Sequence, residues 1–334
     1  MDPWVWMVVV LALAFEYVNG FHDAANAIAT SVLTRALTIK NAVLLCAGLN
    51  FIGALLSTAV ATTMGKGIVS PEFVTHKVVA AALLGAIIWD LITWHWGLPT
   101  SSTHAIVGGI IGAVAGSRGM GVLNLAGTKK VFTGLILSPI VGIVGACVVM
   151  IAFLWIFGRK PPSKVNRRFR LIQVASAGLM ALSHGSNDGQ KSMGVIAMAL
   201  FSGSAVAHGG HPAEFHIPFW VMVSCATAMG LGSGAGGWRI IKTVGRKVME
   251  LQPIHGCVAE FSAATIILAA SHVGAPISTT HTISSTIMGV GMSRRLSAVR
   301  WKVVGNVVGA WLLTLPAAAL IAYLMVHALM RLPG

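Results

Sequence analysis

The sequence predicts an all-α, polytopic membrane protein, and three observations support this fold class. Hydrophobic residues make up 56% of the 334 residues and charged residues only 10%, whereas about a quarter of a soluble domain is charged. The mean hydropathy is +0.82. Long apolar segments recur along the whole chain, and a helix of about 20 such residues crosses a bilayer. These segments leave no room for a separate soluble domain.

The apolar segments form two groups of five, separated by one long polar stretch. The first group lies at about 3–30, 41–63, 78–96, 100–116 and 131–157, and the second at about 171–200, 217–237, 254–272, 277–292 and 303–330. The polar stretch contains six basic residues, between Arg159 and Arg170. We therefore expect a first transmembrane repeat at 1–157, a basic cytoplasmic linker at 158–170, and a second transmembrane repeat at 171–334.

The basic residues predict the orientation in the membrane. If the linker at 158–170 is cytoplasmic, most Lys and Arg residues fall on its side, as the positive-inside bias requires. Both termini are then external. The formal net charge of +14 follows from this topology, and the basic residues do not line an aromatic-studded patch of the kind that binds nucleic acid. We expect the lipid bilayer as a partner and no nucleic acid.

Two motifs recur in the two groups, in the same order. GFHDAAN at 20–26 matches GSNDGQK at 185–191, and GLPTSSTH at 97–104 matches GAPISTTH at 274–281. Because each group has an odd number of segments, the second copy lies upside down, which is the inverted-repeat pattern of secondary transporters. The short segments after the second motif either cross the bilayer or return as re-entrant hairpins, and the orientation is the same in both cases.

Five of the nine acidic residues lie within apolar segments: Glu16, Asp23, Asp90, Asp188 and Glu260. A charge in the hydrocarbon core costs at least about 2.5–3.5 kcal/mol on insertion scales. Asp23 and Asp188 occupy matching places in the two repeats, so we expect both to have a function, and Glu260 is a third candidate. Snorkelling near an interface or a paired structural charge is the alternative for Glu16, Asp90 and Glu260.

The segments that carry these aspartates are long. As continuous helices, 3–30 and 171–200 would each measure roughly 42 Å at about 1.5 Å per residue, which exceeds a hydrocarbon core of about 30 Å. Gly20 and Gly185, with polar neighbours, predict helices interrupted near the middle of the membrane, and tilt or protrusion is the alternative. A broken helix presents N–H groups to an anion and C=O groups to a cation. Asn26 shares a helix face with Asp23 at the i, i+3 spacing.

Two runs of hydroxyl residues form the predicted anion site. They comprise Ser101, Ser102 and Thr103 in the first half and Ser278, Thr279 and Thr280 in the second. Each run follows a proline and offers hydroxyls together with the amides of a starting helix. Ordinary N-capping is the alternative. The spacing of His104 and His281 does not decide between proton carriers, anion donors and hydrogen-bonded helix residues.

The sequence contains no nucleophile–base constellation and no phosphate-binding loop of an ATP-driven pump. We therefore predict that the protein is not an enzyme and that it has neither a cofactor nor a metal site. Its four cysteines are scattered through apolar stretches without a C-x-x-C pair, which favours buried thiols.

Four stretches together resemble the signature stretches of the inorganic phosphate transporter (PiT) family, in the family's order. They are GFHDAANAIAT at 20–30, GLPTSSTHAIVGG at 97–109, SHGSNDGQKSMG at 183–194 and GAPISTTHTISS at 274–285. The resemblance covers nearly the whole chain. It implies uptake of inorganic phosphate by symport with H⁺ or Na⁺, through alternating access, in a bacterial inner or plasma membrane. It also implies that Asp23, Asn26, Asp188 and the hydroxyl runs line the anion and cation sites. On this basis we assign Asp23, Asp188 and Glu260 to cation coupling.

One departure concerns the coupling ion. Sodium-coupled members usually end the second motif in Asn. This chain has Lys191 there, and the proton-coupled bacterial branch also has a lysine at that place. A fixed ammonium can take the place and charge of a bound cation and help to neutralise phosphate, so we favour H⁺ over Na⁺. Together with Asn26, Lys191 is assigned to substrate binding.

Several alternatives remain at this point. A sulfate/H⁺ symporter of the same family and a passive anion channel are the other functions, and some relatives carry phosphate as a neutral metal complex. Phosphate is favoured over sulfate because at neutral pH it still carries a proton that Asp23 or Asp188 can accept. The sequence does not decide between a monomer and a homo-oligomer.

Overall fold

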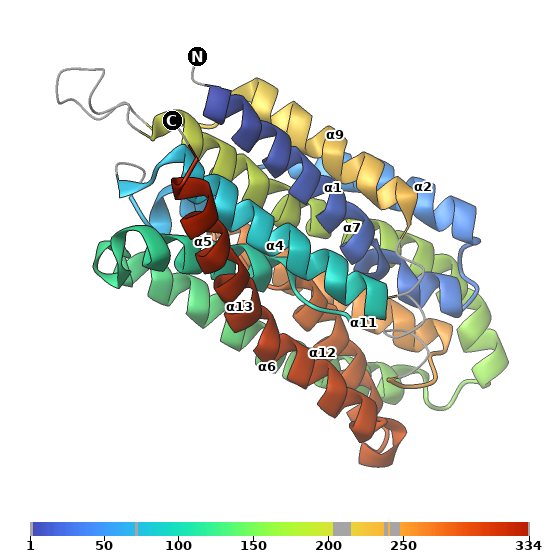
Figure 1. The fold of residues 1–334 in the computed structure, drawn as a ribbon. Coiled ribbons are helices and arrows are strands. Elements are labelled where there is room, and N and C mark those ends of the chain that lie inside the picture. Colours follow the sequence, from blue (N-terminus) through green and yellow to red (C-terminus); the bar gives the residue numbers. More distant parts are fainter. Residues whose placement is uncertain (1–2, 71–72, 203–214, 237–239, 241–247, 333–334) are drawn as a thin grey trace.

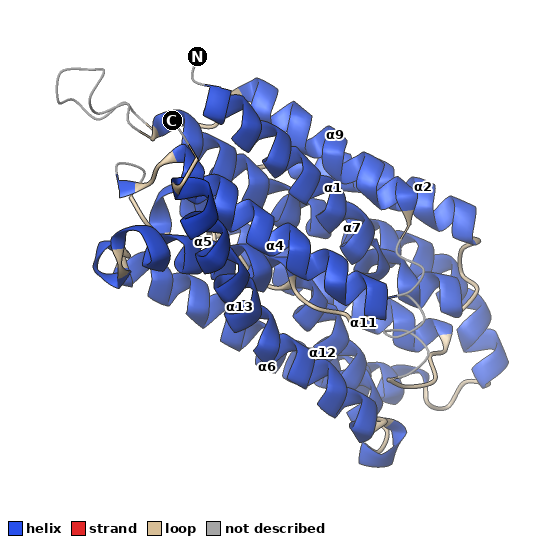
Figure 2. Ribbon diagram, viewed as in Figure 1, coloured by secondary structure: helices blue, strands red, loops and turns tan. Residues whose placement is uncertain are grey.

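The computed structural model describes residues 3–70, 73–202, 215–236, 240 and 248–332. Within these residues the regular elements are helices, apart from one isolated bridge between Val69 and Leu123. Figure 2 shows the helices, which confirm the predicted all-α fold class. They lie side by side as an elongated bundle (Figure 1).

Ten helices build the described bundle: α1 (Pro3–Leu33), α2 (Ile39–Ala54), α4 (His76–Trp96), α5 (Ser102–Arg118), α6 (Leu125–Phe157), α7 (Pro162–Phe201), α9 (Phe219–Ala235), α11 (Pro253–His272), α12 (Thr279–Met292) and α13 (Trp301–Met330). Shorter turns lie between them: α3 (Ala59–Thr62), η1 (Thr63–Gly67), η3 (Met120–Val122) and η5 (Leu296–Ala298). Five of the described helices, α1, α4, α6, α11 and α13, are long and apolar enough to cross a membrane.

The helices α1 and α7 run unbroken through Gly20 and Gly185, so the prediction that they are interrupted there is wrong. The glycines allow close helix packing instead. A Cβ on Gly20 would lie 2.7 Å from the carbonyl oxygen of Met229 in α9, and one on Gly185 would lie 2.2 Å from that of Asn50 in α2. A bend of 64° lies elsewhere, between α2 and the turns α3 and η1.

The expected linker at 158–170 is mostly helical. Pro162 begins α7, because proline fits the first turn of a helix, where its missing N–H costs nothing. The basic residues from Lys164 to Arg170 therefore lie on the first turns of α7, and only the short stretch from Gly158 to Pro161 connects it to α6.

Two helical hairpins point into the bundle from opposite ends. Gly97 and Gly274, with φ of 66° and 65°, make the left-handed turns that follow α4 and α11. After each turn, residues 99–103 and 276–280 are buried, and the tips meet where the Thr103 hydroxyl donates to the Ile277 carbonyl oxygen over 2.9 Å. The rings of His104 and His281 lie 4.4 Å apart at this contact. The geometry matches the re-entrant alternative for both short segments.

The peripheral helices α6 and α13 cover these hairpins. The helix α13 packs on α4 and α5, and α6 packs on α11 and α12. Their outward faces are apolar: Trp155 is 84% exposed and Leu312 is 75% exposed. Such faces suit contact with lipid, so the buried polar groups of the bundle lie behind an apolar surface.

Gly112 on α5 tests the contact with α13. A Cβ there would lie 2.0 Å from the Ala319 carbonyl oxygen, whereas one on Gly309 of α13 meets nothing within 4 Å. We expect Gly112→Ala to lower the unfolding temperature of the purified protein, because overpacking costs typically about 1–3 kcal/mol. Gly309→Ala should leave it unchanged or raise it, because alanine favours helix by about 1 kcal/mol. Equal unfolding temperatures for the two variants would contradict the close packing of α5 and α13.

Candidate functional site

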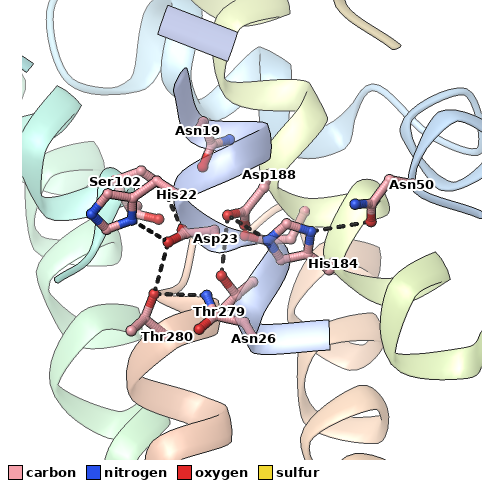
Figure 3. A network of polar contacts seen from close by, with 12 residues as sticks. Asn19, His22, Asp23, Asn26, Asn50, Ser102, His184, Asp188, Thr279 and Thr280 are labelled. Carbon is pink, nitrogen blue, oxygen red and sulfur yellow. Dashed lines mark hydrogen bonds and ion pairs between the residues drawn. The ribbon is translucent and has the colours of Figure 1, made fainter. Parts of the chain in front are cut away.

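Two carboxylates meet at the centre of the bundle. Asp23 on α1 is 2% exposed and Asp188 on α7 is 0% exposed. Each of the two aspartates, together with His184, offers a ligand atom, and these three atoms lie within 4.8 Å of one another. The two residues that the sequence placed at equivalent positions are thus neighbours in space (Figure 3). Two like charges this close in an apolar bundle are unfavourable unless positive groups compensate them.

Three buried basic side chains lie beside the carboxylates: the Lys191 ammonium, and two histidines that add positive charge when they are protonated. The Nδ1 atom of His22 lies 2.8 Å from Oδ1 of Asp23. The Nζ atom of Lys191 lies 2.7 Å from Oδ1 of Asp188, and Nε2 of His184 lies 3.5 Å from its Oδ2. Both partners of Asp188 come from α7 itself, at i−4 and i+3, so a single helix face carries the cluster.

The sequence analysis assigned no role to His22 or His184. Both lie inside the recognised stretches. The i, i+4 spacing of His184 and Asp188 could have indicated that they share a face of α7. His22 directly precedes Asp23, and this spacing does not indicate a contact. His22 is also held from α4, because its Nε2 lies 3.2 Å from the Thr93 hydroxyl. His184 is held from α2, where its Nδ1 lies 3.1 Å from Oδ1 of Asn50.

The residues of the two hydroxyl runs make different kinds of contact. Ser101 and Ser278 are N-caps, since their side-chain oxygens accept the amides of His104 and His281 over 3.2 and 3.1 Å. For these two serines the structure therefore shows the N-cap alternative, and neither contacts the carboxylates in the described contacts. Each cap fixes the start of a return helix beside the buried pair.

The second hydroxyl of each run contacts the buried carboxylates. Ser102 donates to Oδ2 of Asp23 over 3.0 Å, and Thr279 donates to Oδ2 of Asp188 over 3.1 Å. Thr280 donates to Oδ1 of Asp23 over 3.3 Å and accepts from Nδ2 of Asn26 over 2.8 Å (Figure 3). Each hairpin tip is thereby tied to a carboxylate on α1 or α7.

Among the remaining intramembrane acids, Glu260 lies apart from the pair. Glu260 bonds with Thr30, Gln173 and Ser176, and Ser176 lies about 18 Å along α7 from Asp188 at 1.5 Å per residue. The structure therefore does not bring Glu260 to the predicted site. It joins α1, α7 and α11 instead.

Glu16 and Asp90 are also buried. Glu16 accepts from Ser192 and Asn19, and these contacts link α1 to α7. Within the described part of the chain, neither carboxylate oxygen of Asp90 has a hydrogen-bond partner. Glu16 is thus hydrogen-bonded to neutral side chains, whereas neither a charged nor a neutral partner is seen for the Asp90 carboxylate among the described residues.

The arrangement supplies what a small oxyanion and a cation need. An ammonium, an imidazole and several hydroxyls converge on one place, and the carboxylates beside them can accept protons or bind a cation. The site is sealed, because Asp23, Asp188 and Lys191 are all buried. A ligand can therefore reach the site only after the surrounding elements move.

The fold and this sealed, charged site define the class, a multi-pass membrane protein. Residues 19–322 match the model of the phosphate transporter family. The chain belongs to this family. Proteins named "Probable low-affinity inorganic phosphate transporter" are similar to it. The one from Rhizobium meliloti is 46% identical over 95% of this chain and 94% of its own, and the one from Bacillus subtilis is 46% identical over 94% and 93%.

A solved structure agrees with this assignment. A structure described as "The sodium-dependent phosphate transporter" superposes with a TM-score of 0.87 at 26% identity, and the match covers 99% of this chain and 100% of the other. The relatives are named as transporters, which confirms the prediction that the chain is not an enzyme.

The ion pair between Lys191 and Asp188 has a direct test. Lys191→Gln leaves the Asp188 carboxylate buried without its ammonium, and breaking a buried pair in this way costs about 3–5 kcal/mol. We expect a clear fall in the unfolding temperature of the purified protein. The double variant with Asp188→Asn should recover much of the loss, because it removes the uncompensated charge. If the double variant is less stable than Lys191→Gln, the pairing is wrong.

Proposed function

We propose that the chain is a secondary active transporter that takes up inorganic phosphate across a bacterial cell membrane by symport with a cation. One observation carries the proposal: carboxylates from two matching motifs meet in a sealed site where two hairpin tips touch. The substrate is inferred from the names of the relatives, and the bacterial membrane is inferred from their source organisms. Asp23 and Asp188 handle the cation. Asn26, Lys191, and the hydroxyls of Ser102, Thr279 and Thr280 hold the anion.

The proposed mechanism is alternating access between two inverted repeats. Matched helix contacts support it. The helix α1 packs against α9 as α7 packs against α2, and α13 covers the first hairpin as α6 covers the second. The hairpins enter from opposite ends and meet at the site. Withdrawal of one tip would open the site to one side of the membrane, and withdrawal of the other tip would open it to the opposite side.

We favour H⁺ as the coupling ion because the chain carries its own cation. Lys191 lies against Asp188, at the place that matches Asn26 in the first half. An ammonium there offsets one carboxylate without a bound metal ion, while protonation can neutralise the other. The name of the superposed structure points to sodium for that protein, which makes Na⁺ the alternative for this one.

Phosphate is preferred to sulfate on chemical grounds. At neutral pH phosphate retains a proton, and the Asp23 carboxylate can accept a hydrogen bond from it, whereas sulfate offers no donor. A passive channel is the other alternative. It would more naturally carry several basic residues along a pore, whereas the described site contains a single Lys and is closed.

Uptake by proteoliposomes tests the function. Labelled phosphate should accumulate against its gradient when an inward proton gradient is imposed without sodium, and excess sulfate should not compete. Accumulation that requires sodium would keep the transport function and remove the role given to Lys191. Competition by sulfate would indicate a sulfate carrier. Flux without accumulation would indicate a channel.

Asp23→Asn and Asp188→Asn test the assigned carboxylates in the same assay. Each should abolish accumulation while the protein still inserts and elutes as a single folded species, because asparagine keeps the shape and removes the charge. Ser224→Ala is the matched control, since that exposed hydroxyl bonds only to its own helix at Trp220. Normal accumulation by both aspartate variants would show that the coupling assignment is wrong.

A further inference from the structure

A second charged site lies outside the buried one, where α12 passes into α13. A cavity of about 550 Å³ opens there, and Arg294, Arg295 and Arg300 line it together with Glu250 and Ser297. It lies at the end of the bundle that holds the connection between α6 and α7, which the charge bias predicts to be cytoplasmic. None of these residues belongs to the site between α1 and α7.

The local fold holds the three arginines around this hollow. The amides of Arg294 and Arg295 both donate to the Gly291 carbonyl oxygen at the end of α12. The amide of Arg300 donates to the Val248 carbonyl oxygen over 3.0 Å. This bond holds Arg300 beside Met249 and Glu250, which also line the cavity. The helical turn η5 lies between these two points. The backbone therefore fixes where the three side chains start, although the side chains themselves are exposed.

The hollow carries an excess of positive charge. Among the described residues that line it, one is acidic: Glu250 is 94% exposed, and its Oε1 lies 3.8 Å from Nη2 of Arg300. Arg294 also lines an adjoining cavity of about 190 Å³ with Lys160 and His255, so the basic surface continues beyond the hollow. Topology and the dipole of α12 explain basic residues at this end of the bundle. Neither requires three guanidinium groups to surround one cavity.

The chemistry of the lining identifies a class of ligand. Guanidinium groups bind phosphoryl oxygens through paired hydrogen bonds. The cavity falls within the range of about 300–1,000 Å³ that is typical of small-molecule sites, which is more room than a single phosphate ion fills. We propose that Arg294, Arg295 and Arg300 form a binding site for a phosphoryl anion larger than inorganic phosphate. Two sources share this chemistry, a soluble polyphosphate and the headgroup of an anionic phospholipid.

A ligand at this place would act on one hairpin. The helix α12 begins with Thr279 and Thr280, which contact the buried carboxylates, and ends at Met292, two residues before Arg294. Its length is about 21 Å at 1.5 Å per residue. An anion that holds Arg294 and Arg295 would restrain the far end of this helix and so the movement of its tip. This consequence rests on the proposed transport function, whereas binding itself does not.

Binding to the purified full-length protein in neutral detergent tests the site. Tripolyphosphate is the soluble probe, and micelles with phosphatidylglycerol in place of phosphatidylcholine are the lipid probe. We expect one of them to raise the unfolding temperature of the wild type. The triple variant Arg294→Gln, Arg295→Gln, Arg300→Gln should bind that probe at least about tenfold more weakly, because even one charge-assisted hydrogen bond contributes about 1.5–3 kcal/mol.

Two further variants make the result specific. Lys164→Gln, Arg167→Gln, Arg168→Gln removes the same charge from the first turns of α7 and should bind like the wild type. Glu250→Gln removes the one acidic group and should bind the probe more tightly. A response to tripolyphosphate identifies the soluble source, and a response to phosphatidylglycerol alone identifies the lipid. Equal binding by the two triple variants, or no response to either probe, would overturn the proposal, and neither result depends on phosphate transport.

Discussion

The structure depends on burying two carboxylates side by side in an apolar bundle. Asp23 and Asp188 are fully enclosed, and their charges would repel each other without nearby compensation. The Lys191 ammonium lies 2.7 Å from Asp188, and His22, which is positive when protonated, lies 2.8 Å from Asp23. The hairpin-tip hydroxyls then satisfy the remaining carboxylate oxygens. This one requirement links α1 and α7 to α5 and α12, and it explains why the two motifs of each half must occur together.

Much of the fold could be predicted because apolar segments, and the Gly, Pro and charged residues that separate them, can be recognised from the local sequence. The expected segment 254–272 differs from α11 by one residue, and 78–96 differs from α4 by two. The contacts between helices were harder to predict. Gly20 and Gly185 suggested breaks, whereas they allow α9 and α2 to approach closely. A glycine between polar residues gives the same local signal in both situations, and only the neighbouring helix distinguishes them.

Several residues of the site could be predicted from the sequence, but the contacts between them across helices could not. The repeat identified Asp23 and Asp188, and Lys191 was found because it departs from the pattern of the first half. Their partners on other helices had no signal in the spacing. His22 is held from α4. Glu260 was grouped with the aspartates because it is an intramembrane acid, although its hydrogen bonds place it in a separate cluster. Spacing along one helix defines a shared face, but it does not say which helix that face meets.

We propose that Lys191 takes the place of a bound cation, so that phosphate binding needs no sodium. The most direct measurement is the affinity of the purified protein for phosphate in sodium chloride and in choline chloride at equal ionic strength. We predict the same dissociation constant in both salts. A dissociation constant that falls steeply as sodium replaces choline would contradict the claim, because the site would then require an added cation despite the ammonium of Lys191.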